Sequence, residues 1–356
     1  MTKLTLNKND NEFFVAICKD SFHSFLVFGV RDNTTKINRI LARIGKFCDM
    51  NNPDTYFLNA GLNFLFNETN AQLVSEMVLT ENNNQKLISS VSTISYKAYT
   101  INIENYCSFL EMLAKSKRFT EKDRLSAYQV IAEDDASLTF KFERIKDGTK
   151  DRAISLKTDV DEQVGANNIS LGNSCRHTAL SLLELGFGSR FYDVDIISNY
   201  SDFAKPFPYQ TKLSRAFFIE KEWRNYVANK LGDDLLIFPL PPNPLLGNAN
   251  DPSYLILKKI FKQLHAVSNR HLDNEVTYKK FYLIKTLYET VDSLKNKPLE
   301  EAFVAIDKWA SDHAGLIDQK RSFTFFSTTG TRDMVDSLLQ MKEKLLSVKK
   351  NVSDIR

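Results

Sequence analysis

The N-terminal segment alternates apolar runs with a polar turn, in the pattern of a β-hairpin. Residues 12–18 read Glu-Phe-Phe-Val-Ala-Ile-Cys, residues 22–30 read Phe-His-Ser-Phe-Leu-Val-Phe-Gly-Val, and the residues between them are polar. Runs of aromatic and β-branched residues bounded by polar residues are typical of strands. Both faces of the second run are apolar, so we predict a strand buried on both sides, with His23 near its start.

The segments that follow predict a mixture of helices and strands. Apolar residues between Ile37 and Phe47 recur at helical spacing and predict a short helix. The Asn-rich stretch 50–90 predicts loops around one helix near 70–79. Further along, the patterns predict a strand over 92–103, a helix over 104–115, a hairpin of 128–132 with 137–145, and a polar loop over 146–168.

A helix start follows at 172–179, where the chain reads Gly-Asn-Ser-Cys-Arg-His-Thr-Ala. Asn173 or Ser174 can cap this helix, and glycines at 186 and 188 can end it. The proline cluster at 239–244 then breaks regular structure. Four apolar stripes at helical spacing come after the cluster and predict a small bundle. We therefore predict an α+β chain with a catalytic domain at 1–245 and a helical domain at 246–356.

Composition and charge narrow the class of protein. The 356 residues carry 47 Lys and Arg against 44 Asp and Glu, a net charge of +3, which does not favour a nucleic-acid partner. No apolar run reaches the length of a transmembrane helix, and the first twenty residues are too polar for a signal peptide. The four cysteines lack disulfide or zinc spacing, and no phosphate-binding glycine motif occurs, so we expect neither metal nor cofactor and a reducing compartment.

Cys175 is the strongest candidate for chemistry. In the first turn of a helix it lies beside unpaired backbone N–H groups, which stabilise a thiolate and can hold an oxyanion. Asn173, two residues upstream, can cap the helix or donate its amide to that oxyanion. We predict a thiol pKa at least one unit below the ~8.5 of a free thiol. The alternative is a small buried hydrophobe, the commonest use of a free cysteine.

A base must accompany that thiol, and His23 is the best candidate. A structural imidazole bonded to backbone is the alternative for this residue. His177 follows two positions after Cys175 on the same helix and points about 200° away. Cys18 is a rival nucleophile, since it lies five residues from His23 across the predicted turn. The other histidines, His265, His271 and His313, lack metal-ligand spacing and lie in the helical tail.

These two motifs resemble the circularly permuted papain-like proteins. Residues 22–25 read Phe-His-Ser-Phe at an early strand, and residues 173–177 read Asn-Ser-Cys-Arg-His at a later helix start. The order of histidine before cysteine resembles the permuted papain-fold peptidases and the lecithin–retinol acyltransferase family. Ser174 is an insertion in their Asn-Cys-x-His-Phe-like motif, and Thr178 stands where they have Phe. The resemblance implies a papain-like catalytic domain.

A second resemblance is to a set of uncharacterised Legionella proteins, several of which are translocated effectors. It is carried by residues 173–180, by 208–213 (Pro-Tyr-Gln-Thr-Lys-Leu) and by 238–244, and it covers residues 10 to about 245. The resemblance implies a secreted effector that acts in the host cytoplasm, with an export signal within 341–356. Without it, the sequence predicts a cytoplasmic protein.

The function predicted from these residues is cysteine-dependent acyl transfer, by a protease or a deubiquitinase-like isopeptidase that acts on a host protein, including ubiquitin or a ubiquitin-like protein. Cys175 is the nucleophile, His23 the base, and Asn173 with the helix N–H groups stabilises the oxyanion. A polar side chain between Ser92 and Asn102 is expected to orient His23. Two alternatives stay open: an acyltransferase or transglutaminase with the same dyad, and a non-catalytic effector that binds a host protein. The oligomeric state stays open as well.

Overall fold

The computed structural model describes residues 3–48, 69–76, 88–115, 125–145, 160–170, 172–188, 205–217, 230–232, 235–243, 251–269, 275–319 and 329–353. These residues divide into two compact units, of which one ends at Leu240 and the other begins at Pro241. The division falls inside the proline cluster at which the sequence places a boundary. Antiparallel sheets and helices are both present, so the α+β class is confirmed.

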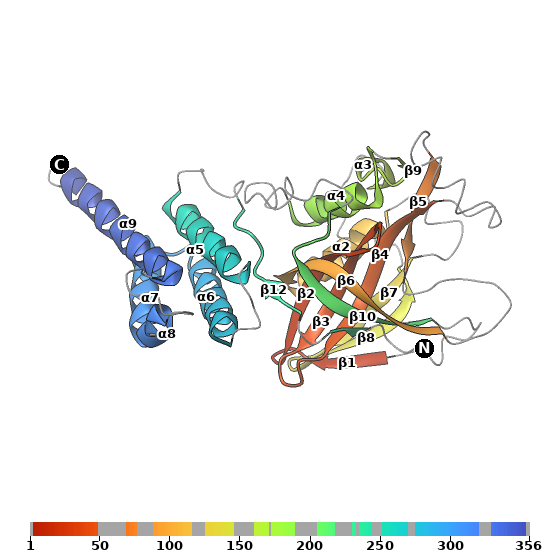
Figure 1. Ribbon diagram of the computed structural model, residues 1–356, viewed down its shortest axis with the longest axis horizontal. Coiled ribbons are helices and arrows are strands. Elements are labelled where there is room, and N and C mark those ends of the chain that lie inside the picture. Colours follow the sequence, from red (N-terminus) through yellow and green to blue (C-terminus); the bar gives the residue numbers. More distant parts are fainter. Residues whose placement is uncertain are drawn as a thin grey trace. The chain divides into compact units, whose positions relative to one another are not determined.

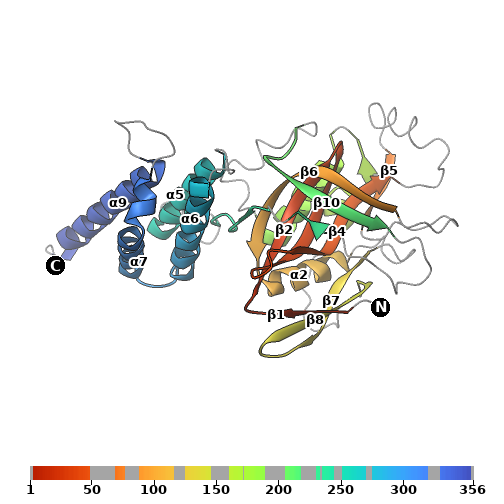
Figure 2. The same cartoon turned by 60° about the horizontal axis from the view of Figure 1, so that its bottom comes forward.

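A barrel forms the centre of the first unit (Figure 1). Its strands are β2 (Asn11–Asp20), β3 (His23–Asp32), β4 (Asn38–Cys48), β6 (Ile88–Ile101), β10 (Tyr209–Phe217) and β11 (Lys230–Leu231). They pair in the order β11-β10-β6-β2-β3-β4, and β11 also pairs with β4, which closes the ring. Beyond the ring, β5 (Thr69–Ser75) and β9 (Asn168–Ile169) extend the sheet from β4, and β12 (Ile237–Phe238) pairs with β6. Figure 2 shows β6, β10, β2 and β4 from a second direction.

The predicted N-terminal hairpin is confirmed as β2 and β3. Its last pair is Asp20 with His23, so the turn consists of Ser21 and Phe22 alone. Ser21 has φ 54°, a left-handed conformation that such a tight turn requires. From Ser24 to Arg31 every residue of β3 is buried, as expected for a strand covered on both faces.

Two of the helix predictions in this region are wrong. The segment predicted as a helix over 37–47 is strand β4, and the helix predicted near 70–79 falls on β5. From Ile40 to Lys46 both faces of β4 are buried, so apolar residues occupy consecutive positions and imitate helical spacing. The rest of the Asn-rich stretch before β6 lies outside the described residues.

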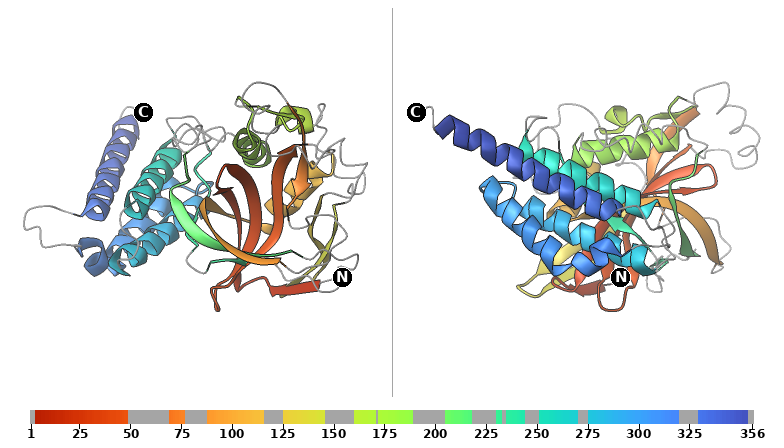
Figure 3. Two further views of the ribbon diagram at one scale, coloured as in Figure 1. Left: turned by 45° about the vertical axis from the view of Figure 1, so that its right-hand side comes forward. Right: turned by 60° about the vertical axis from the view of Figure 1, so that its left-hand side comes forward.

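The predicted helices over 104–115 and from 173 onward are confirmed as α2 (Ile103–Leu113) and α4 (Cys175–Phe187). α4 packs against β3, β4 and α2. The ring of Phe28 on β3 lies 4.3 Å from that of Phe109 on α2 and 6.5 Å from that of Phe187 on α4. This aromatic contact fixes α4 on the barrel, and the left view of Figure 3 shows the green helix nearly end-on beside the barrel strands.

A second sheet has the order β1-β8-β7, with β1 (Lys3–Asn7), β7 (Ser126–Glu133) and β8 (Ser137–Arg144). It confirms the predicted hairpin, whose turn is held by the Asp134 carboxylate accepting the N–H groups of Ala136 and Ser137. Of the predicted loop over 146–168, residues 146–159 lie outside the described part, and the short helix α3 (Val160–Gln163) and the first residue of β9 follow.

The second unit confirms the four predicted helical stripes. They lie on α5 (Pro252–Ser268), α6 (Glu275–Ser293), α7 (Leu299–Asp312) and α9 (Gly330–Ser353), and a short helix α8 (Ala314–Asp318) is added. Each long helix buries its stripe, as Ile260, Ile284, Ile306 and Leu338 illustrate. No helix in the described parts of the chain is both long and apolar enough to span a membrane.

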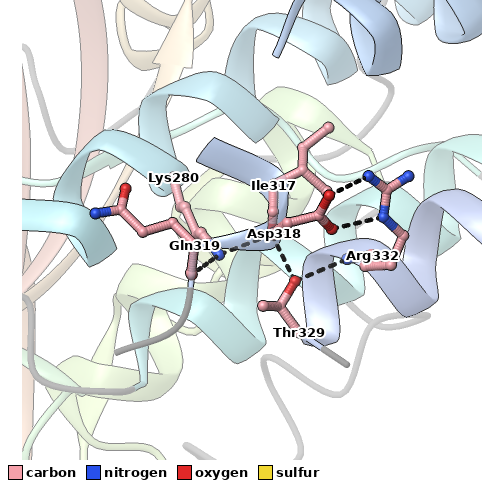
Figure 4. A network of polar contacts seen from close by, with 6 residues as sticks. All are labelled: Lys280, Ile317, Asp318, Gln319, Thr329 and Arg332. Atoms are coloured by element: carbon pink, nitrogen blue, oxygen red, sulfur yellow. Dashed lines mark hydrogen bonds and ion pairs between the residues drawn. The ribbon is translucent and has the colours of Figure 1, made fainter. Parts of the chain in front are cut away.

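A polar network closes the helix ends of this unit (Figure 4). The buried ammonium of Lys280 donates to the carbonyl oxygens of Ile317 (3.0 Å) and Gln319 (2.7 Å), at the end of α8. Arg332 forms a bidentate ion pair with Asp318, both contacts at 2.7 Å. The network therefore ties α6, α8 and the start of α9 together.

Candidate active site

Helix α4 presents Cys175 at its first position. The N-cap is Ser174, whose backbone is extended at φ −76° and ψ 169°. The Ser174 N–H donates to Nδ1 of His177 at 3.2 Å, and the Ser174 hydroxyl lies 2.9 Å from the same nitrogen. His177 is thus part of the helix cap, which agrees with the expectation that it does not serve Cys175. The N–H of Cys175 has no partner inside the helix and can hold a negative charge.

The thiol of Cys175 and the imidazole of His23 are hydrogen-bonded to each other. Burial raises the pKa of the Cys175 thiol. The hydrogen bond and charge of His23, together with the backbone N–H groups of Ser24 and Cys175, outweigh that effect, so the pKa lies below its usual value. The two residues that the sequence proposes as nucleophile and base therefore meet, although 152 positions of chain separate 23 from 175.

Glu76 completes the arrangement. Its Oε1 lies 2.5 Å from Nε2 of His23, which leaves Nδ1 of the ring for the thiol. Burial lowers the pKa of His23, but the charge of Glu76 and the hydrogen bonds to Cys175 and Glu76 raise it to about 10. A raised imidazole pKa and a lowered thiol pKa favour the same state, the thiolate–imidazolium pair.

Arg43 holds the buried carboxylate of Glu76 in place. Its Nη2 lies 2.5 Å from Oε2 of Glu76, and the Glu76 N–H donates to the carbonyl of Arg43 at 2.9 Å. Burial raises the pKa of Glu76, but the opposing effect of Arg43 and His23 is larger. The pKa therefore lies below its usual value, and the side chain is a carboxylate. The Arg43 guanidinium also lies 3.9 Å from the ring centroid of Phe25, which stacks on His23 at 5.5 Å.

Glu76 was not predicted from the sequence as the residue that orients His23. The orienting residue was expected between Ser92 and Asn102, on the strand now known as β6. That expectation is corrected, because β6 borders β2 on the side away from β3, whereas Glu76 follows β5 beside β4. The only local signal is a single carboxylate directly after the strand β5, and the wrong helix prediction over this segment concealed it.

Gly45 allows the imidazole and the carboxylate to meet. It pairs with Phe25 across β3 and β4. A Cβ at this position would collide with Oε1 of Glu76 and lie 3.0 Å from Nε2 of His23. The absence of a side chain at position 45 is therefore a requirement of the site.

Asn173 has a different use from the one predicted. Its amide nitrogen donates to the carbonyls of Gly165 (2.8 Å) and Asn168 (3.2 Å) and lies 2.6 Å from Oδ1 of Asn168. The amide hydrogens are therefore taken up by the preceding loop, and the N-cap is Ser174. Of the two residues predicted as alternative helix caps, Ser174 is therefore the one used, and the predicted oxyanion role of Asn173 is corrected. Asn173 shapes the loop that leads into Cys175.

Lys46 fixes the same loop from the barrel. Its buried ammonium donates to the carbonyls of Gly165 and Asn173, each at 2.8 Å, to Oδ1 of Asn173 at 3.0 Å and to the hydroxyl of Thr178 at 3.1 Å. Lys46 directly follows Gly45 on β4, so this one strand contributes to both parts of the site. Gly45 leaves space for the contact between His23 and Glu76, and Lys46 anchors the loop that leads to Cys175.

The other cysteines are poorly suited to nucleophilic chemistry. Cys18 pairs with Phe25 and is fully buried, and burial raises the pKa of its thiol well above the usual value. Burial and nearby carboxylates raise the pKa of Cys107 to about 11. The side chain of Cys48 lies outside the described residues, as does His271. His265 and His313 belong to the helical unit.

Comparison of the chain with models of known protein families, with curated proteins and with solved structures finds no match. Any assignment therefore rests on the site itself. Among the described residues, no three His, Cys, Asp or Glu side chains gather as metal ligands. The site contains a thiol with a lowered pKa, an imidazole with a raised pKa and a buried carboxylate, each in contact with the next. Such a set can form and hydrolyse a covalent thioester.

Proposed function

We propose that the chain is a cysteine-dependent acyl-transfer enzyme, in which Cys175 is the nucleophile, His23 the acid and base, and Glu76 the group that orients His23. The observation that carries the proposal is the continuous contact from Cys175 through His23 to the Glu76–Arg43 pair. Such a nucleophile–base–carboxylate arrangement recurs on unrelated folds and is identified by its geometry.

The reaction proceeds in two halves. The Cys175 thiolate attacks the substrate carbonyl carbon, a C–S bond forms, and the carbonyl oxygen becomes an oxyanion beside the Cys175 N–H. The His23 imidazolium then gives its proton to the leaving nitrogen, and the C–N bond breaks to leave a thioester. Neutral His23 next takes a proton from water, whose oxygen attacks the thioester carbon. The C–S bond breaks, and a carboxylic acid, the thiolate and the imidazolium remain.

A papain-like architecture of the permuted kind is the fold we propose for the first unit. Two features support it: a barrel that supplies the histidine, and a helix on that barrel whose first residue is the cysteine. The chain order, histidine before cysteine, is the order of the permuted proteins that the sequence resembles.

Hydrolysis of a protein substrate by a peptidase or isopeptidase is the reaction we favour. An acyltransferase or transglutaminase would use the same three residues and differ only in its acceptor, an amine or alcohol in place of water. For the setting we propose the host cytosol, on the Legionella resemblance and the unpaired cysteines, with the helical unit recognising a protein partner. A binding-only effector would not require a thiol with a lowered pKa.

The test is to trap the covalent intermediate. We expect wild type to release a burst of p-nitrophenol from p-nitrophenyl acetate and to carry acetyl on Cys175 by mass spectrometry. His23→Ala should slow the burst, and Cys107→Ser, the matched control, should leave it unchanged. Adding an amine then separates the two classes: product amide indicates a transferase and acetate alone a hydrolase. Absence of any Cys175 adduct would contradict the proposal.

A further inference from the structure

The turn between β2 and β3 carries a large exposed apolar side chain directly before His23. Phe22 is 77% exposed, the most exposed of the large hydrophobic residues in the described chain, and it is covalently joined to His23. A single exposed Phe would need no explanation. Here, however, a second such residue lies at the same end of the barrel.

That residue is Val91 on β6, which is 65% exposed. The hydroxyl of Ser92 donates to the Asp20 carboxylate at 3.3 Å, which brings this part of β6 to the hairpin end. Asp20 closes the turn that carries Phe22. Phe22 and Val91, here termed the apolar rim, therefore both border the end of the hairpin at which β3 begins with His23.

The rim adjoins a strand edge that has no strand partner among the described residues. β2 pairs with β6 from Phe13–Ile101 to Lys19–Ser95 and then turns away at the hairpin. From Val91 to Ile94, β6 continues and, among the described strands, pairs only with β10, on its other side. Unpaired N–H and C=O groups along such an edge are the surface on which an extended peptide adds a strand.

We infer that an extended polypeptide pairs with the β6 edge at 91–94, and that the residue directly after its scissile bond is apolar and lies on the rim formed by Phe22 and Val91. The inference rests on the proposed function and names its substrate class. The side of the scissile bond is part of the inference: His23 protonates the leaving nitrogen, and Phe22 is bonded directly to His23, so we assign the rim to the leaving-group side.

The experiment uses the full-length chain and a proteome-derived peptide library with blocked amino termini, and it identifies cleaved bonds by mass spectrometry. We expect an apolar residue directly after the cleaved bond. For a peptide chosen from the library, Phe22→Ala and Val91→Ala should each lower kcat/KM about tenfold, a loss of about 1.4 kcal/mol of transition-state binding. Rates are divided by the concentration of iodoacetamide-reactive Cys175, so that misfolded protein does not enter the comparison.

Ile131→Ala is the matched control, because Ile131 is an exposed aliphatic residue, at 43%, on β7 of the other sheet. It should leave the cleavage pattern and kcat/KM unchanged. A peptide with an ester in place of the second amide after the scissile bond should be cleaved at least about fivefold more slowly, since it lacks one N–H donor to the β6 edge.

Three other results would overturn the inference, and each shows whether the rim, the polypeptide substrate or the proposed function is at fault. Cleavage with no apolar preference, or with the same preference in both rim variants, would contradict the rim and leave the thiol chemistry intact. Turnover of p-nitrophenyl acetate with no cleavage of the library would exclude an extended polypeptide and retain the proposed function. Failure of both substrates would refute the proposed function and the inference with it.

Discussion

Each of the two units contains a cluster of charged side chains, and the clusters differ in what they lead to. In the helical unit, Lys280 donates to main-chain carbonyls at the end of α8, and Arg332 pairs with Asp318 (Figure 4). In the barrel unit, Glu76 is shared between Arg43 and His23, and His23 continues to Cys175. The first cluster closes helix ends. The second ends on a nucleophile.

Burial alone does not separate these clusters, because Lys280 is as deeply buried as Arg43 and Glu76, each with 3% of its surface exposed. The difference lies in the titrating groups. The pKa of His23 is raised and that of Cys175 is lowered, so the two coupled groups favour opposite charges. Variants in the barrel cluster and in the helical cluster can test this difference.

The largest effect is expected from the two reacting residues. Cys175→Ser and His23→Ala should each lower the turnover of p-nitrophenyl acetate by about a thousandfold, since neither variant can form the thiolate–imidazolium pair. Lys280→Met, on the other side of the comparison, should cost about 1–3 kcal/mol of unfolding free energy and leave turnover per folded molecule unchanged. Equal turnover in wild type and Cys175→Ser would place the chemistry elsewhere.

Gly45→Ala should lower turnover about a hundredfold, because the new Cβ occupies the space of the Glu76 carboxylate and displaces it from His23. Gly315→Ala is the control: a Cβ there meets no heavy atom within 4 Å. Its turnover should equal that of wild type. Full activity in folded Gly45→Ala protein would show that the close contact between Glu76 and His23 is unnecessary.

Glu76→Gln should change the pH profile more than the maximal rate. Removing the carboxylate charge lowers the pKa of His23 from about 10, so the imidazolium is lost at lower pH and the alkaline limb of the profile moves downward. A shift of one unit corresponds to about 1.4 kcal/mol, or tenfold in turnover on that limb. Glu275→Gln, which removes a surface pair with Lys279, should leave the limb in place. An unshifted limb in Glu76→Gln would contradict the orienting function.

The smallest effect is expected at the surface of the helical cluster. Arg332→Ala removes a bidentate pair with Asp318, and we expect a loss of about 1 kcal/mol or less of unfolding free energy, because both side chains are partly exposed. Turnover should not change. A fall in turnover per folded molecule would mean that the helical cluster contributes to catalysis, and the contrast between the clusters would be lost.

Local signals in the sequence were sufficient for half of the site. Cys175 at a helix start and His23 at the entry of a buried strand are each evident from a few neighbouring residues. The hairpin, α2, α4 and the helical stripes were predicted for the same reason.

Features that depend on contacts between distant segments were missed. β4 was predicted as a helix because burial of both its faces removes the alternation that identifies a strand. Glu76 and Gly45 gain their importance from being beside His23, which no local pattern reveals. Asn173 was assigned to the oxyanion because its real partners, Gly165, Asn168 and Lys46, come from a loop and a strand that the sequence does not bring together.

The central claim, that Cys175 is activated by His23, is tested most directly by site-resolved iodoacetamide labelling across a pH series. Because its pKa is lowered, Cys175 should label first and retain its rate near pH 6. Cys18 and Cys107, whose pKa values are raised by burial, should label slowly. In His23→Ala protein the midpoint of Cys175 labelling should move to higher pH. Faster labelling of Cys18, or a Cys175 profile unchanged in His23→Ala, would contradict this pairing of nucleophile and base.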